Sequence, residues 1–269
     1  MNRSLTISFG GGAWYALFYL GAAQYIHEHA KTDGKKHMKY AGISAGSSAA
    51  SALALGIEPR IIAEELISVQ PMCTNVRRTF KMVHGVALDT VPRDDDVCRL
   101  TSDRLLIGLS EYMSIIHFKE HKKTTFMDRN DLLRALQATC NIPILNGIEP
   151  VYVCGRPFYD GNICYNWKNL PTFSNNESER TLYITSKTNE YLKEFRQGWI
   201  SPRIDIPKSW QLCPPGPDAL RFLMRLGYLR TWEYISVYEN ELFNSTTEDT
   251  HELQDELDTL TNQKHLVYS

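Results

Sequence analysis

The sequence lacks the residue patterns that mark metal-binding, disulfide-stabilised and nucleic-acid-binding proteins. Its six cysteines are scattered through 269 residues, and no two of them have Cys-x-x-Cys spacing. This distribution indicates neither a zinc site nor a disulfide framework, so we expect free thiols in a reducing compartment. The formal net charge is only −2. It leaves no broad basic field for nucleic acid, and we expect no nucleic-acid partner.

Long apolar runs are also absent. No stretch of about 20 uninterrupted apolar residues occurs, so we expect no membrane-spanning helix. The first nine residues lead directly into a strand pattern, without the apolar region of a secretory signal. Apolar residues make up 43% of the chain and charged residues 22%. These fractions are typical of a globular protein with a sizeable core, and we expect a cytoplasmic location.

The N-terminal part of the chain alternates between strand and helix patterns. Residues 5–9 alternate apolar and polar side chains and predict a strand, and residues 13–29 have the wide apolar face of a helix. Residues 33–36 are expected to form a turn, and residues 37–43 a second strand. A small-residue helix then follows Ser44. This βαβα order predicts an α/β fold of three layers, α/β/α, around a central and mainly parallel sheet.

Later elements are predicted from apolar periodicity and turn residues. The expected strands are 105–109, 114–118, 151–154, 156–159 and 182–185, and the expected helices 59–70, 131–140, 217–226 and 228–243. Residues 71–103 are less regular and are the best candidate for a mobile cover or a surface insertion. Their acidic run, 94–96, is interpreted as a solvated loop rather than a calcium site. We assign residues 1–243 to one domain, followed at 244–269 by a polar tail that is disordered or a short amphipathic helix.

The segment Gly42-Ile43-Ser44-Ala45-Gly46 stands between the second strand and the following helix. A serine between glycines at such a turn has the form of a nucleophile elbow, the Gly-x-Ser-x-Gly motif. The helix N-terminus would favour negative charge developing on the serine oxygen. The alternative is that Ser44 is an ordinary helix cap.

A second candidate element is Gly10-Gly11-Gly12, which lies between the first strand and the first helix. Backbone N–H groups at a helix start have no helical acceptor, and glycines let a ligand approach them closely. These three residues can therefore form an oxyanion hole. A dinucleotide-binding loop is the alternative, but Gly-x-Gly-x-x-Gly spacing would require glycine where the chain has Tyr15.

The sequence marks no histidine as the base for a serine nucleophile. In an ordinary α/β-hydrolase the histidine comes late in the chain. Only His251 and His265 are late, and both lie in the polar tail. Asp160 follows a predicted strand, so it can reach the same sheet edge as Ser44. It is either the base or part of an ordinary Asp-Gly turn.

Several weak motifs occur in an order that is informative as a set. They are residues 7–13 with 19–21, the elbow at 42–46, residues 115–118, 132–135 and 140–144, and Asp160-Gly161 with 169–171. In order and spacing the chain resembles the patatin-like phospholipase family over about residues 5–171, most closely its adiponutrin and adipose triglyceride lipase branch. A weaker likeness continues to about residue 230.

The resemblance implies a patatin-like fold and a catalytic dyad without histidine. Ser44 would be the nucleophile, Asp160 the base, and Gly10, Gly11 and Gly12 the oxyanion hole. No cofactor or metal is implied. The substrate would be a phospholipid or an acylglycerol, met at the surface of a membrane or a lipid droplet. The usual small residue after Asp-Gly is replaced by Asn162, which tolerates a left-handed turn but puts catalytic efficiency in question.

Other functions remain open at this point. The same dyad could pass the acyl group to a lipid alcohol, which would make the protein an acyltransferase. The chain could also be a catalytically silent lipid-binding scaffold, or a Ser-His-Asp esterase that depends on its tail. Four aromatic residues beside the glycine loop either line an acyl pocket or belong to the helix core: Trp14, Tyr15, Phe18 and Tyr19.

Overall fold

The structure is a computed structural model. It describes residues 4–73, 75, 82, 85–86, 89–93, 97–173, 180–188, 190–194, 196–239, 242–244 and 250–262. The acidic run 94–96 and most of residues 74–96, the middle part of the candidate cover or insertion at 71–103, lie outside these described residues. No helix of the described part is both long and apolar enough to cross a membrane.

An eight-stranded mixed sheet forms the centre of the molecule, with strands in the order β5-β6-β3-β2-β1-β7-β8 and with β4 paired to β3. The strands are β1 (Leu5–Phe9), β2 (Met38–Gly42), β3 (Leu105–Ser114), β4 (His117–Lys123), β5 (Val151–Val153), β6 (Arg156–Tyr159), β7 (Arg180–Ile184) and β8 (Trp199–Ile200). The pairs from β3 through β2, β1 and β7 to β8 are parallel. The pairs β3–β4, β3–β6 and β5–β6 are antiparallel.

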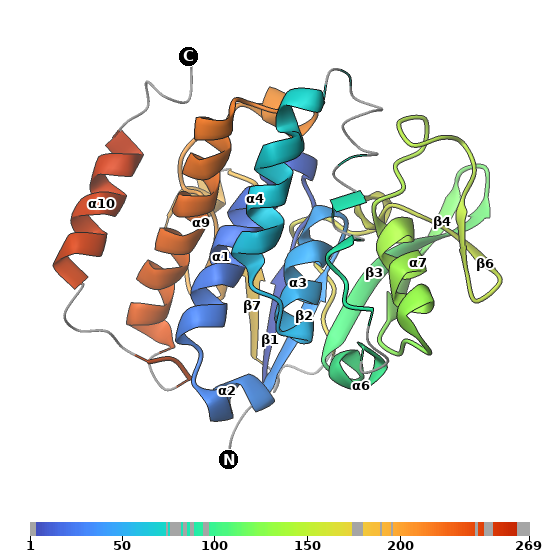
Figure 1. Cartoon of the computed structure of the whole chain (residues 1–269), viewed down its shortest axis with the longest axis horizontal. Coiled ribbons are helices and arrows are strands. Elements are labelled where there is room, and N and C mark those ends of the chain that lie inside the picture. The colour runs from blue at the N-terminus through green and yellow to red at the C-terminus, as the bar shows by residue number, and fades with distance from the viewer. Residues whose placement is uncertain are drawn as a thin grey trace.

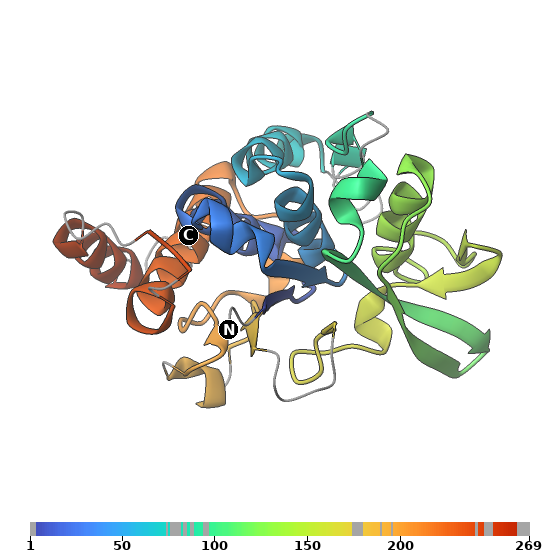
Figure 2. The same ribbon diagram turned by 90° about the horizontal axis from the view of Figure 1, so that it is seen from below.

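Helices flank this sheet (Figure 1). The α-helices are α1 (Ala16–His29), α2 (Thr32–Lys36), α3 (Ala45–Leu55), α4 (Pro59–Val69), α6 (Val97–Thr101), α7 (Arg129–Thr139), α8 (Glu190–Lys193), α9 (Pro217–Tyr238) and α10 (Thr250–Asn262). Short 3-10 helices are η1 (Ala13–Tyr15), η2 (Gln70–Met72), η3 (Gly161–Ile163) and η4 (Lys208–Gln211). Figure 2 shows α1, α3, α4 and α7 on one face of the sheet and the short helices η3 and α8 on the other. The predicted α/β fold with a central, mainly parallel sheet is therefore confirmed, although its third layer is thin.

The central strand β1 explains how two predicted loops come together. All five of its residues are buried, and it pairs with β2 on one side and β7 on the other. Phe9 is in register with Gly42. Because parallel strands end at the same sheet edge, the glycine loop after β1 and the serine turn after β2 leave the sheet side by side.

Glycine allows the two longest core helices, α1 and α9, to pack with their backbones in contact. A Cβ on Gly21 would lie 1.8 Å from the Met224 carbonyl oxygen, and one on Gly227 would lie 2.0 Å from that of Phe18. The predicted break between residues 226 and 228 is wrong for this reason. Gly227 lies inside one continuous helix, α9, where it allows close contact with α1. This helix ends at Tyr238.

Two other boundaries differ from the sequence prediction, and the structure decides between the two alternatives for the tail. The expected turn at residues 33–36 is part of the short helix α2. The two short strands predicted around residues 105–118 are the long strands β3 and β4 of one hairpin. In the tail, residues 250–262 are helical, with Leu257 buried and Glu256 paired with Arg225 of α9.

Candidate functional site

Ser44 lies in a strained turn between β2 and α3. Its backbone has φ 47° and ψ −129°, which is unusual for a residue with a side chain. A Cβ on Gly42 would lie 2.6 Å from the Gly46 carbonyl oxygen, and one on Gly46 would lie 2.2 Å from that of Gly10. The turn is therefore as tight as a nucleophile elbow requires. Ser44 occupies the N-cap position of α3, but its side chain makes no capping hydrogen bond to the helix, so it is not an ordinary helix cap.

The Ser44 hydroxyl instead donates to Asp160. The Oγ–Oδ2 distance is 2.8 Å, and both residues are buried. The other carboxylate oxygen, Oδ1, accepts from the Asn162 backbone N–H at 2.8 Å. The backbone of Asp160 is also held, because its N–H donates to the Asn141 carbonyl and its carbonyl accepts from the Ser110 hydroxyl. These hydrogen bonds to the carboxylate and to the backbone of Asp160 hold the carboxylate in place beside the Ser44 hydroxyl.

Burial changes the acidity of this carboxylate. Desolvation raises the pKa of Asp160 to about 6, against the lowering effect of hydrogen bonds from the Asn162 backbone, Ser44 and the Asn162 side chain. An ordinary aspartate is a poor base for a hydroxyl, since its pKa is about 3.9. The buried position therefore makes Asp160 a stronger base while leaving it ionised near neutral pH.

Sequence reasoning missed the residue that holds the Ser44 backbone. The Ser44 N–H donates to the Thr139 hydroxyl at 2.9 Å, and that hydroxyl donates to the Gly108 carbonyl at 2.7 Å. Thr139 is the last residue of α7 and lies 95 positions from Ser44. Nothing in the local sequence around Thr139 marks this role, because its partners come from two other segments.

The glycine loop borders the same space, and its three N–H groups are not equivalent. The Gly10 N–H donates to the Ile184 carbonyl at 2.9 Å, as a continuation of the β1–β7 pairing. This bond corrects the expectation that all three glycines supply oxyanion donors. The N–H groups of Gly11 and Gly12 have no acceptor in the described part of the chain.

Two side chains determine how this loop is oriented. The Tyr19 hydroxyl donates to the Gly11 carbonyl at 2.9 Å. Since a peptide's C=O and N–H point in opposite directions, this bond turns the Gly12 N–H away from Tyr19. On the other face, a Cβ on Gly11 would lie only 2.0 Å from the Asn162 amide nitrogen. The Asn162 side chain therefore covers Gly11. The position of Asn162 in the sequence, directly after Asp160-Gly161, does not predict this contact.

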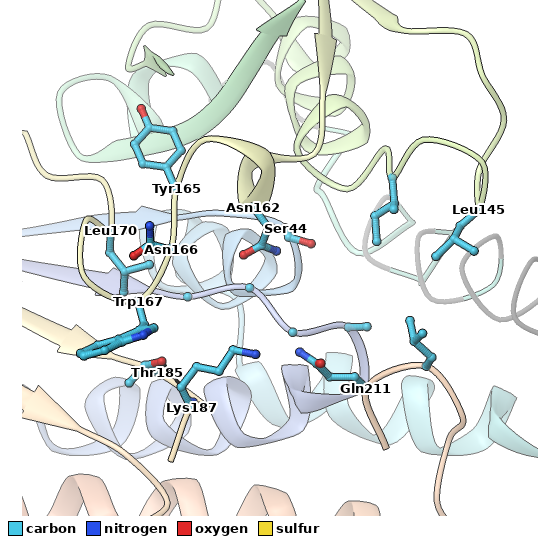
Figure 3. A pocket seen from close by; sticks show the side chains of 16 residues that line it. Ser44, Leu145, Asn162, Tyr165, Asn166, Trp167, Leu170, Thr185, Lys187 and Gln211 are labelled. Carbon is cyan, nitrogen blue, oxygen red and sulfur yellow. Dashed lines mark hydrogen bonds between the residues drawn. The ribbon is translucent and has the colours of Figure 1, made fainter. Parts of the chain in front are cut away.

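Ser44 and the glycine loop open into a pocket of about 400 Å³ (Figure 3). The lining residues are Gly10, Gly11, Gly12, Ala13, Ser44, Ile142, Leu145, Asn162, Tyr165, Asn166, Trp167, Leu170, Thr185, Lys187, Gln211 and Leu212. The four aromatic residues considered for an acyl pocket are buried in the core and do not line it. The apolar lining comes instead from later segments of the chain.

No described histidine is hydrogen-bonded to Ser44 or Asp160. His251 lies on α10, which Figure 1 shows beyond α9 and away from the end of β2. His84 and His265 lie outside the described residues. The described residues also contain no cluster of three or more His, Cys, Asp or Glu side chains that could hold a metal ion.

The chain is similar to known proteins over most of its length. A family model described as Patatin-like phospholipase matches residues 7–172. Patatin-like phospholipase domain-containing protein 2 of Homo sapiens is 26% identical over 253 residues, which cover 84% of this chain and 47% of that protein. The Rattus norvegicus protein of the same name is 26% identical over 249 residues, covering 82% and 49%. The chain thus spans about half the length of these relatives.

A shorter relative and a solved structure are also similar. Patatin-like phospholipase domain-containing protein 4 of Homo sapiens is 29% identical over 174 residues, covering 60% of this chain and 65% of that protein. VipD from Legionella pneumophila has a TM-score of 0.49 and 12% identity, with 87% of this chain and 66% of that chain covered.

Proposed function

The chain belongs to the patatin-like phospholipase family, a family of lipid hydrolases, and we propose that it cleaves fatty-acyl esters through a Ser44–Asp160 dyad. The observation that carries this proposal is the 2.8 Å hydrogen bond from the Ser44 hydroxyl to the buried Asp160 carboxylate, beside an open pocket. A nucleophile within hydrogen-bonding reach of its base is the geometry that covalent catalysis requires.

In the first half of the reaction, Asp160 accepts the proton of Ser44 as the serine oxygen attacks the ester carbonyl. The carbonyl oxygen becomes negatively charged and receives hydrogen bonds from the N–H groups of Gly11 and Gly12. Each donor of this kind contributes about 10²–10³ in rate in other acyl-transfer enzymes. Asp160 then returns the proton to the departing alcohol, and the acyl group stays on Ser44.

In the second half, water replaces the alcohol. Asp160 takes a proton from the water, whose oxygen attacks the acyl-enzyme, and the same N–H groups stabilise the second oxyanion. Collapse releases the fatty acid and restores the Ser44 hydroxyl with the proton held by Asp160. The helix dipole of α3, whose N-terminus lies at Ser44, favours the serine alkoxide in both halves.

The apolar lining supports an acyl chain as the group bound next to Ser44. Ile142, Leu145 and Leu212 supply this lining. We infer that the substrate is a phospholipid or an acylglycerol, and that the enzyme meets it at the surface of a membrane or a lipid droplet. An acyltransferase would use the same acyl-enzyme, with a lipid alcohol in place of water.

The test is lipid-class profiling of wild type beside Ser44→Ala, with Ser48→Ala, in the helix that follows Ser44, as a matched control. We expect Ser44→Ala to lose ester cleavage and labelling by a fluorophosphonate probe, and Ser48→Ala to keep both. Retained cleavage in purified Ser44→Ala would refute the dyad. Failure of the wild type to label would favour a silent lipid-binding scaffold. Transfer of the acyl group to an added lipid alcohol would identify an acyltransferase.

A further inference from the structure

The pocket beside Ser44 is lined by both apolar and polar side chains. Figure 3 shows Leu145 on one side of Ser44 and, toward the other, the polar Asn166, Thr185 and Lys187 together with the apolar Trp167 and Leu170. We call the part around Asn166, Thr185 and Lys187 the polar side of the pocket. It offers groups that can bind the polar part of the substrate beyond the scissile ester.

Lys187 supplies the charge on this polar side. Among the sixteen lining residues it alone carries a charged side chain, and no described carboxylate pairs with it. Its ammonium is directed into the pocket, toward Asn162 and Gln211 (Figure 3). Asp160 does not line the pocket, because it is buried behind Ser44. A ligand on the polar side thus meets one positive charge and several hydrogen-bonding groups, and no acid.

The backbone that carries Lys187 is fixed to the sheet and to the neighbouring segments. The Thr185 N–H donates to the Ile200 carbonyl at 3.0 Å, and the Lys187 N–H donates to the Thr185 hydroxyl at 3.2 Å. The Thr188 hydroxyl donates to the Ile204 carbonyl at 3.0 Å. Lys187 therefore has a fixed Cα position, from which its long side chain reaches the pocket.

The same segment is joined directly to the oxyanion loop. The Ser186 N–H donates to the Tyr19 hydroxyl at 3.1 Å, and that hydroxyl donates to the Gly11 carbonyl at 2.9 Å. The Ser186 and Tyr19 hydroxyls are also hydrogen-bonded to each other, at 2.8 Å. Tyr19 thus holds the segment that carries Lys187 in register with the loop that would hold the reacting carbonyl.

We propose that Lys187 forms a head-group subsite that binds the phosphate of a glycerophospholipid while its acyl ester lies at Ser44. The proposal rests on the acyl-ester hydrolase function above and adds the class of its substrate. Lysine is a strong ligand for phosphate, and its exposed position at the rim suits a head group that stays in water. A neutral acylglycerol offers no anion at this point, so the subsite favours phospholipid over acylglycerol.

The test compares phosphatidylcholine with diacylglycerol of the same acyl chains, presented in the same mixed detergent micelles. Lys187→Met removes the charge and keeps the length of the side chain, and Lys208→Met is the matched control from the neighbouring 3-10 helix. We expect kcat/KM for phosphatidylcholine to fall about tenfold in Lys187→Met, with diacylglycerol cleavage within twofold of wild type. Lys187→Glu should fall further on phosphatidylcholine alone. Equal losses on both lipids, or no loss on either, would overturn the subsite.

Binding measurements separate this proposal from the catalytic one. In the Ser44→Ala background, a short-chain phosphatidylcholine below its micelle concentration should bind at least tenfold more weakly once Lys187→Met is added. This result supports the subsite even where the dyad assignment has failed, and unchanged binding overturns it even where the dyad stands. Glycerophosphocholine should compete with the bound lipid better than inorganic phosphate does. Equal competition by inorganic phosphate would identify a free-phosphate site and overturn the head-group assignment.

Discussion

The side chains of Ser44 and Asp160, 116 residues apart in the chain, are joined by a 2.8 Å hydrogen bond. The strand β3 brings them together, because its first residues pair with β2 and its middle residues with β6. Ser44 follows the first of these partner strands and Asp160 the second. Between the two pairings, a Cβ on Gly108 would lie 2.6 Å from the Ile43 side chain, so this part of β3 has room only for glycine.

The pKa of Asp160 sets the expected pH dependence of ester cleavage. Burial raises this pKa to about 6, and the carboxyl acts as a base only when it is ionised. We therefore expect kcat/KM to be constant above pH 7 and to fall below pH 6, by about tenfold per pH unit. A pH–rate profile of wild type with a soluble ester measures this. A midpoint near pH 4 would show that burial does not raise the pKa of Asp160.

The same shift predicts a gain in stability when the charge of Asp160 is removed. The folded protein binds this proton more tightly than the unfolded chain, because the pKa rises from 3.8 to about 6 on folding. Ionisation thus costs up to about 3 kcal/mol above pH 6, and nothing below about pH 4. Asp160→Asn should have no esterase activity yet a higher free energy of unfolding at pH 7.

Denaturant unfolding of wild type and Asp160→Asn at pH 7 and at pH 4 checks this prediction. The difference between the two proteins should be about 1–3 kcal/mol at pH 7 and should shrink toward zero at pH 4. A variant that is less stable than wild type at pH 7 would contradict the account.

Thr139 is expected to hold the strained Ser44 backbone in place. Thr139→Val has nearly the same shape but leaves the Ser44 N–H and the Gly108 carbonyl without their shared partner. Unsatisfied buried groups cost about 1–3 kcal/mol, and kcat should fall by about tenfold or more as the serine shifts. Thr139→Ser retains the hydroxyl and should stay close to wild type in stability and rate. Equal behaviour of the two variants would argue against the hydroxyl's role.

The contact between Gly11 and Asn162 can be tested with a pair of substitutions. In Gly11→Ala the new methyl would lie 2.0 Å from the Asn162 amide nitrogen, so the loop or the amide must move. We expect kcat to fall by about 10²-fold, since the Gly11 and Gly12 N–H groups lose their alignment. Adding Asn162→Gly removes the obstacle and should recover at least tenfold. A double variant as slow as Gly11→Ala alone would show that the steric contact is not the cause.

Several elements could be predicted from neighbouring residues alone. The strand predicted over residues 5–9 has the observed bounds of β1, and the helix predicted from Pro59 is α4 with its proline in the first turn. The short strands joined at Gly155 form the hairpin of β5 and β6, with Gly155 at φ 75°. In each case the signal lies within a few residues, as alternation, capping or turn chemistry.

Other predictions failed where distant contacts override local preference. Gly227 weakens a helix in isolation, but within α9 it allows the backbone to approach α1, and the gain from packing exceeds the local cost. From the sequence alone, the N–H groups of Gly10 and Gly11 are equivalent candidates for oxyanion donors. The pairing of β1 with β7 removes Gly10, because its N–H donates to the Ile184 carbonyl. The four aromatic side chains near the glycine loop are buried. Phe18 and Tyr19 lie on α1, which packs against α3 and α9, and Trp14 and Tyr15 lie on η1, which packs against α3 and η4.

By itself, therefore, the sequence determined the α/β class, the serine turn, the glycine loop and the Asp-Gly turn, since each depends on residues close together in the chain. Only the tertiary structure decided which groups meet at the site. Thr139 behind Ser44, Asn162 over Gly11 and Lys187 in the pocket come from separate segments. Their positions depend on strand order and on hydrogen bonds across many tens of residues, which no local pattern records.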